Sequence, residues 1–197
     1  MLGDMSPAVT PPPQPRRDAL ALAAYHQLAH HGFEGLRTRE VAAEAGVNIA
    51  TLHYYFPSKE ELIGAVLSHA MQRFRSTLDV ADGSGNQLRT HFDGLRRLLR
   101  DEPELFAVMG ELALRAARDQ AIHDLFQNTT DTWRRAIKGL LIKAAQDGFL
   151  EAPGDPDAQA SLVVAAVMGA CMIPVWQPAR RAEAIRELQR SLGLRSA

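Results

Sequence analysis

The chain has only one cysteine, Cys171, among its 197 residues. A single cysteine excludes a framework of internal disulfides and is typical of proteins in a reducing compartment, so we expect a cytoplasmic protein. This cysteine lies in the apolar run LVVAAVMGACMIPVW. A buried structural thiol is expected there rather than a reactive nucleophile, because no oxyanion-forming glycine turn flanks it.

Long hydrophobic segments are also missing. The longest apolar run, residues 162–176, is shorter than the ~20 residues that span a bilayer, and Pro174 interrupts its end. We therefore expect a buried helix and no membrane partner. The stretch MLGDMSPAVTPPPQPRR has no apolar segment of the kind a secretory signal needs, and it is rich in proline. Residues 1–15 are accordingly expected to form a disordered tail.

The chain carries little net charge, with a formal value of -1. This gives no overall attraction to nucleic acid or to acidic membranes, so any such contact must come from local geometry. Residues 16–60 hold five basic and five acidic side chains. To attract a polyanion such as DNA, Arg37, Arg39 and Lys59 would therefore have to lie together near the face that meets it.

Strand periodicity is absent, and nearly every segment after residue 16 has helical spacing, which predicts an all-α fold. Leu20, Ala24 and Leu28 recur at four-residue steps, and Gly32 is expected to end this first helix. The stretch ADGSGNQ, residues 81–87, predicts a turn or short linker. Beyond it, helices are predicted at about 87–100, 103–117, 119–148, 156–173 and 179–193.

Two short helices follow the first one. Thr38 is expected to cap a helix that Gly46 ends, with an inner face of Val41, Ala42 and Ala45. Asn48 is expected to cap the next helix, which runs to about Phe56 and is stopped by Pro57. Residues 58–61 match the capping box S-x-x-E and predict a fourth helix with Leu62, Val66, Ala70 and Phe74 on its buried side.

The spacing of the two short helices is that of a helix-turn-helix, whose second helix can enter a DNA major groove. Val47, Leu52 and Phe56 are expected to face inward. The remaining side chains of the second helix would then form an exposed face made of Ile49, Ala50, Thr51, His53, Tyr54 and Tyr55. Thr51 can hydrogen-bond a base, Ile49 can pack on a thymine methyl group, and small residues allow close approach. The alternative is a helical hairpin with aromatic residues in an ordinary core.

The residues Leu20 to about Val66 resemble the DNA-binding domain of the TetR family of transcriptional regulators. The resemblance is carried by HGFEGLRTREVAAEAGV, then by N-x-x-T-L-H-Y-Y-F, and then by PSKEEL. It implies contacts to double-stranded DNA from Thr38, Arg39, Asn48, Ile49, Ala50, Thr51, His53, Tyr54, Tyr55 and Lys59. His53 stands where the family usually has a phosphate-binding Tyr, and Asn48 replaces the commoner Ser.

The resemblance also implies a three-helix DNA-binding domain at residues 16–62 and a larger helical regulatory and dimerisation domain at residues 63–197. Residues 156–173 and 179–193 would form the homodimer interface, and the dimer would bind a palindromic operator. The uncharged face around Val163, Val167, Ala170 and Ile173 requires burial, either in the core or against a partner.

The family's middle helices enclose a cavity for a small-molecule effector. The candidate lining residues here are Phe92, Leu95, Phe106, Met109, Leu112, Phe126, Trp133, Met168 and Met172, although such side chains are more often plain core. His91, Arg115 and His123 could anchor polar groups, but solvated surface positions are favoured for all three.

Two alternatives to a ligand-released repressor remain. One is a helix-turn-helix protein controlled by a protein partner, which the sequence barely separates from the ligand-responsive reading. The other is a helical enzyme. His26 and His30 could share a metal ion, but no third ligand follows at a supporting spacing. The phosphate-binding motifs G-x-x-x-x-G-K-[ST] and G-x-G-x-x-G are absent. We expect no metal, no cofactor and no catalytic residues.

Overall fold

The computed structural model describes residues 14–78, 86–151, 154–173 and 177–194, and all regular structure in these ranges is helical. The expected tail at residues 1–13 and most of the turn at 81–87 lie outside the described residues. The helices are α1 (Gln14–Gly35), α2 (Thr38–Glu44), α3 (Ile49–Tyr55), α4 (Lys59–Ser76), α5 (Gln87–Asp101), α6 (Pro103–Ala116), α7 (Gln120–Gln146), α8 (Pro156–Cys171) and α9 (Pro178–Ser191). The all-α prediction is confirmed.

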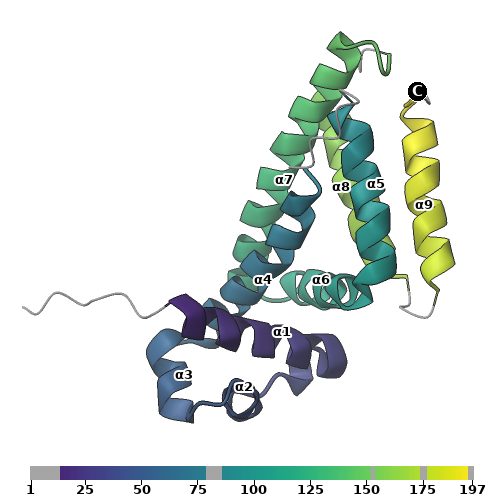
Figure 1. The fold of residues 1–197 in the computed structure, drawn as a ribbon. Helices are drawn as coiled ribbons and strands as arrows, with labels where there is room; N and C mark the ends of the chain where they lie inside the picture. Colours follow the sequence, from purple (N-terminus) through teal and green to yellow (C-terminus); the bar gives the residue numbers. More distant parts are fainter. Residues whose placement is uncertain (1–13, 79–85, 152–153, 174–176, 195–197) are drawn as a thin grey trace, which may run out of the picture.

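The helices fall into a small group and a large group (Figure 1). Helices α1 to α3 lie together at one end of the molecule, and α4 leads away from them into the group formed by α5 to α9. Helix α6 lies across the base of the large group, next to α1, and the two helices pack together. Helix α7 packs mainly on α8, and α9 packs on α5 and α8. None of the described helices has the length and apolar character needed to cross a membrane.

Gly32 breaks the first helix, as the sequence predicts. Its φ of 67° and ψ of -178° are not helical, so the residues up to Gly35 continue in a new direction. A positive φ is readily adopted by glycine and is costly for other residues. The start of the helix differs from the expectation: α1 includes Gln14 and Pro15, which the sequence assigns to the tail. Proline is tolerated in a first turn because its missing N–H would have no partner there.

Helix α4 joins the two groups. Ser58 caps it by accepting a hydrogen bond from the Glu61 backbone N–H at 3.1 Å, which confirms this part of the predicted capping box. Leu62, Val66 and Phe74 are fully buried along one side. The helix runs without a break through the expected domain boundary at residues 62–63, so the two groups share one continuous element.

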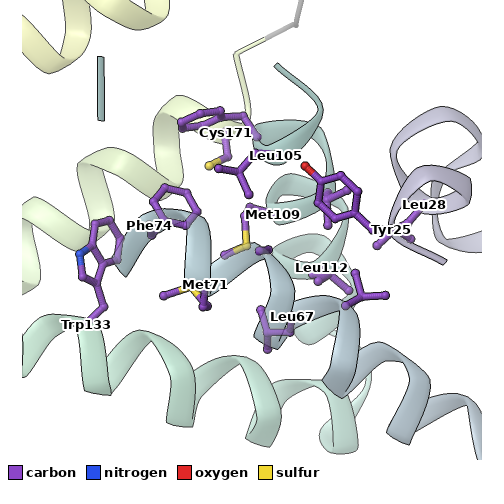
Figure 2. Packing of buried hydrophobic residues seen from close by; sticks show 14 of the residues in the cluster. Tyr25, Leu28, Leu67, Met71, Phe74, Leu105, Met109, Leu112, Trp133 and Cys171 are labelled. Carbon is purple, nitrogen blue, oxygen red and sulfur yellow. The ribbon is translucent and has the colours of Figure 1, made fainter. Parts of the chain in front are cut away.

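The core also runs through both groups (Figure 2). Tyr25 and Leu28 of α1 pack near Leu112 of α6, while Phe74 of α4 lies toward Trp133 of α7. The ring centroids of Phe74 and Trp133 are 5.4 Å apart. Close-packed interiors deform little, so a movement of α6 or α4 should also displace α1, which packs against both helices.

Candidate nucleic-acid interface

Helix α2 is fixed on α1 by polar contacts at one end. Gln27 donates a hydrogen bond to Glu44 Oε2 at 2.8 Å, and His26 Nδ1 lies 3.0 Å from Glu44 Oε1. The hydrogen bond from Gln27 is the main cause that lowers the pKa of the Glu44 carboxyl. His30 lies 3.2 Å from Glu104. His26 and His30 thus each face a carboxylate, and no cluster of three metal-binding side chains occurs within the described ranges.

The start of α2 corrects one expectation. The N-cap is Arg37, which makes no side-chain capping hydrogen bond, and Thr38 is the first helical residue rather than the cap. Since Thr38 does not cap the helix, its half-exposed hydroxyl is not committed to that role.

The turn between α2 and α3 depends on Gly46. Its φ is 67°, and two backbone hydrogen bonds close the helix end: Val47 N–H to Ala42 O at 2.9 Å and Gly46 N–H to Ala43 O at 3.1 Å. This pair is the Schellman motif, which needs a left-handed residue at the glycine position. The turn sets the direction in which α3 leaves α2.

Helix α3 is capped and anchored as the sequence predicts. The Asn48 side-chain oxygen accepts hydrogen bonds from the Thr51 backbone N–H at 2.8 Å and from the Thr51 hydroxyl at 3.0 Å. Leu52 and Phe56 are each 1% exposed, and the Arg17 guanidinium lies 4.8 Å from the Phe56 ring centroid. The helix is therefore held by its inner side and leaves its outer side free.

The outer side of α3 is smaller than the sequence predicts. Ala50, His53 and Tyr54 are exposed, with Tyr54 at 61%, whereas Thr51 and Ile49 are half-buried. Ile49 packs against the core. Tyr55 is only 7% exposed, so its expected place on the exposed face is wrong. Its ring packs at 5.4 Å from Tyr54 in an edge-on geometry, and its main role is structural.

Three cations lie around this helix pair. Arg39 is exposed and forms no ion pair with any residue the structure describes. Arg37 lies 3.9 Å from Glu40, a surface pair of little energetic weight. The Lys59 ammonium lies 4.3 Å from the Phe33 ring centroid, in cation–π range. Although the net charge of residues 16–60 is zero, two exposed arginines therefore lie at α2 and a lysine lies at the start of α4.

Most of the candidate effector residues are ordinary core. Five of them are fully buried, namely Phe92, Leu95, Phe106, Met109 and Leu112. The others lie beside surface cavities. Trp133 lines a cavity of about 250 Å³ between α4 and α7, together with Met71, Arg75, Leu78, Thr129, Thr132 and Ala136. Phe126 and Met168 line another between α7 and α8, and Met172 a third near the end of α8. The sequence thus singled out both walls of the α7–α8 cavity, but only one wall residue in each of the other two cavities.

His91 is fully buried, so the expectation of a solvated surface position is wrong. The Thr77 hydroxyl donates to Phe74 O at 2.6 Å and lies 2.6 Å from His91 Nδ1, so Nδ1–H donates to the hydroxyl. His91 Nε2 then accepts the Trp133 indole N–H at 3.3 Å. Burial lowers the pKa of His91 to about 4. The neutral ring holds Trp133 in place at the α4–α7 cavity.

The other two polar candidates differ from each other. His123 is exposed, as expected. Arg115 is half-buried, forms an ion pair with Asp119 at 3.0 Å, and lies 4.5 Å from the Phe33 ring centroid. Arg115 therefore belongs to the contact between α6 and the end of α1 rather than to a ligand pocket.

The expected dimer face is partly used inside the chain. Val163, Val167 and Ala170 are buried in the core. The opposite side of α8 remains exposed along Ala158, Leu162, Ala165, Gly169 and Met172, which follow one another at steps of four and three residues. Leu162 is 55% exposed and Met172 is 45% exposed.

Comparison with known proteins identifies the short helices as a known module. The family model for bacterial regulatory proteins of the tetR family matches residues 21–66. The dual transcriptional regulator CecR of Shigella flexneri is 36% identical over 114 residues, which cover 58% of this chain and 46% of CecR. The nicotine-responsive repressor HdnoR of Paenarthrobacter nicotinovorans is 28% identical over 136 residues, covering 66% of this chain and 70% of HdnoR. The chain thus spans under half the length of the first of these relatives.

The likeness also extends over the large group of helices. A Rhodococcus sp. protein assigned to the TetR family of transcriptional regulators superposes with a TM-score of 0.74 at 26% identity, over 90% of this chain and 98% of that chain. The fold and the capped, outward-facing α3 define the class of helix-turn-helix transcriptional regulators. Within that class, residues 21–66 form a DNA-binding domain of the TetR family, and the described helices as a whole have the fold of a TetR-family regulator. These relatives and this structural neighbour are transcriptional regulators and not enzymes, which disfavours the enzyme alternative.

Proposed function

We propose that the chain is a homodimeric repressor that binds a palindromic operator through α3 and is released by a small molecule. The observation that carries the proposal is the division of α3 into two sides. Leu52 and Phe56 anchor one side in the core, while Ala50, His53 and Tyr54 are exposed on the other. This outer side does not pack against the core, and basic side chains lie near it, so it suits a DNA groove.

The hydrogen bonding of Thr51 supports a specific role as an acceptor. Its hydroxyl hydrogen is donated to Asn48 Oδ1 at 3.0 Å, which leaves the oxygen as an acceptor. An acceptor in the major groove can pair with the N6 amino group of adenine or the N4 amino group of cytosine. Ala50 allows the backbone to approach closely, and the part of Ile49 that remains exposed would contact a thymine methyl group.

The backbone contacts come from the rim of α3. Arg39, Tyr54 and Lys59 would hold phosphates, with Thr38 and His53 each adding a hydrogen bond. The backbone N–H groups at the start of α4, beside Lys59, add further donors. Tyr55 is not included, because its ring is buried.

The exposed stripe of α8 supports the proposed dimer. Its members Ala158, Ala165 and Gly169 are small and allow close helix approach, while Leu162 offers apolar area. Such a stripe at steps of four and three residues suits packing against the same stripe of a second copy about a two-fold axis. The two copies of α3 would then read half-sites about 34–36 Å apart or a multiple of that spacing.

The cavity between α4 and α7 supports a small-molecule effector. Helix α4 leads directly from the DNA-binding end, so a ligand against Trp133 and Met71 would act on α4. The relative HdnoR is nicotine-responsive by name. The alternative, control by a protein partner, predicts that filling this cavity has no effect on DNA release. Ala136→Phe fills this cavity from its wall and tests the alternative, whereas enlarging the fully buried Met109 would strain the core.

The whole proposal is tested by selecting bound DNA from a random pool with the full chain. We expect an enriched palindrome and a complex of two chains per site, as measured by analytical ultracentrifugation. A recovered sequence without symmetry would contradict the homodimer, and no enrichment over the starting pool would contradict sequence-specific binding.

A further inference from the structure

A cavity of about 360 Å³ lies where the two groups of helices meet, apart from the α4–α7 cavity. Its walls come from the second half of α1, from α6, from the end of α8 and from Arg181 at the start of α9. We call it the junction cavity. Its volume is within the range of about 300–1,000 Å³ that is usual for small-molecule sites.

Arg181 is an unusual wall residue because its charge is buried without a counter-charge. The residue is 1% exposed. Its Nε donates a hydrogen bond to the Ile173 carbonyl oxygen at 2.8 Å, and Nη2 donates to the same oxygen. Its Nη1 is buried and has no hydrogen-bond partner in the described part of the chain. No carboxylate of those residues lies in ion-pair range of it.

The surroundings of Arg181 compensate only part of the free-energy cost of burying its charge. The guanidinium carbon lies 5.6 Å from the Phe106 ring centroid, a favourable but weak contact. Burial lowers the pKa of the Arg181 side chain from its ordinary value, yet an arginine stays protonated in proteins. A buried cation with a free N–H group is costly unless an anion pairs with it. The unpaired donor therefore indicates what the cavity would take up.

The rest of the cavity is partly apolar and exposed. Leu114 of α6 is 58% exposed and Met172 is 45% exposed, and both line the junction cavity. Its frame is tight at Gly110, where an added Cβ would lie 3.0 Å from the Cys171 carbonyl oxygen and 3.0 Å from the Met172 side chain. Apolar walls around one unpaired cationic donor suit a molecule with a hydrocarbon body and one anionic end.

We propose that the junction cavity is a second ligand site, which binds a small amphipathic carboxylate with its carboxyl group on Arg181 and its hydrocarbon part against Leu114 and Met172. The planar guanidinium matches carboxylate geometry, and the low-polarity wall strengthens the pair. The other charged group in the wall, Glu111, is occupied: it accepts the Phe33 backbone N–H at 3.1 Å. The ligand's carboxyl group therefore lies at the Arg181 end.

Because the junction cavity lies between the two groups of helices, a ligand there would affect DNA binding; this consequence rests on the proposed function. Glu111 also packs on Gly32, where α1 breaks, at 3.2 Å from the position of a Cβ. A ligand between α1 and α6 would change how the DNA-binding end sits on the large group. It can shift DNA affinity only by its differential affinity for the two arrangements.

Calorimetric titration of the full chain, without DNA, tests the site with octanoate and the neutral analogue octanamide. We expect octanoate to bind at least tenfold more tightly, because only the carboxylate pairs with Arg181. Arg181→Met should weaken octanoate binding at least tenfold. The matched control Arg180→Met, an exposed arginine on the same helix, should leave the affinity unchanged. Equal affinities for the two probes, or no octanoate binding, would overturn the proposal.

Leu114 provides a second test that does not depend on the folding of the Arg181 variant. The side chain is largely exposed, so either charge should be tolerated there. Leu114→Glu should weaken octanoate binding several-fold more than Leu114→Lys, because both variants lose the apolar contact and only glutamate also repels the carboxylate. Identical octanoate affinities for the two variants would contradict the assignment. Operator release by octanoate is measured separately: octanoate that binds the chain without releasing the operator would contradict the regulatory consequence and leave the ligand site standing, whereas a chain that binds no operator at all would contradict the proposed function.

Discussion

The small and large groups of helices differ in how their candidate functional surfaces are made. In the small group, the surface comes from one helix of seven residues, α3, and from the residues next to it in the sequence. The cavities that involve the large group are each shared by several helices, some of them far apart in the sequence, such as α4 and α7 or α1, α6 and α9. A local surface can be recognised from spacing alone, whereas a shared cavity needs the packing to be known.

The two sides of α3 provide the sharpest contrast inside the small group. Leu52→Ala should lower the free energy of unfolding by about 2–5 kcal/mol, because it removes a buried side chain and leaves a cavity. Tyr54→Ala on the exposed side should change it by less than about 0.5 kcal/mol. Chemical denaturation of both variants checks this. Similar losses for the two would mean that α3 has no free side.

In the large group, the buried His91 should make stability depend on pH. Its pKa is about 6.5 when unfolded and about 4 in the fold. The unfolded state therefore binds more protons between these values, and stability should fall as the pH drops from about 6.5 to 4, by about 3 kcal/mol in total.

His91→Gln should remove most of this dependence, and unfolding curves measured across the same pH range check it. Protonated His91 would also turn a donor toward the Trp133 N–H, which would break their hydrogen bond. The same pH dependence in the variant and the parent chain would show that other groups, such as His69, whose pKa burial also lowers, are responsible.

Thr51 and Lys59 separate base reading from phosphate binding. Thr51→Ala should cost about 1–3 kcal/mol on the operator and almost nothing on random DNA, because a base contact is lost. Thr51→Ser keeps the hydroxyl and is the matched control. Fluorescence anisotropy with both DNAs measures the difference, and equal losses on operator and random DNA would refute base reading by Thr51.

Lys59→Ala is expected to have the smallest and least selective effect. It should weaken binding to all sequences similarly and reduce the slope of log K against log salt by about one. Anisotropy titrations over a range of salt concentrations give the slope. An unchanged slope would show that the ammonium serves the Phe33 ring contact alone.

Features set by neighbouring residues could be predicted from the sequence, whereas features that depend on distant segments could not. Asn48, Gly46 and Ser58 could be assigned from the sequence because caps and left-handed turns are set by neighbouring residues. Tyr55 could not, because a seven-residue helix has no clear periodicity and its burial depends on what packs beside it.

His91 was misassigned for the same reason. A polar residue on an amphipathic helix is usually solvated, and its partners Thr77 and Trp133 come from distant segments. Phe92, Phe106 and Met109 illustrate the related limit for cavities: apolar type and helical spacing indicate burial, but they do not distinguish a filled core from a cavity wall.

The central claim, that the outer side of α3 enters a DNA groove, is tested most directly by a charge placed on that side. Ala50→Glu adds a carboxylate at an exposed position, and Ala184→Glu makes the same change on the exposed side of α9. Anisotropy with the selected operator should show at least a hundredfold weaker binding for Ala50→Glu, an unchanged affinity for Ala184→Glu, and the same melting temperature for both. Parental affinity in the Ala50→Glu variant would contradict the claim.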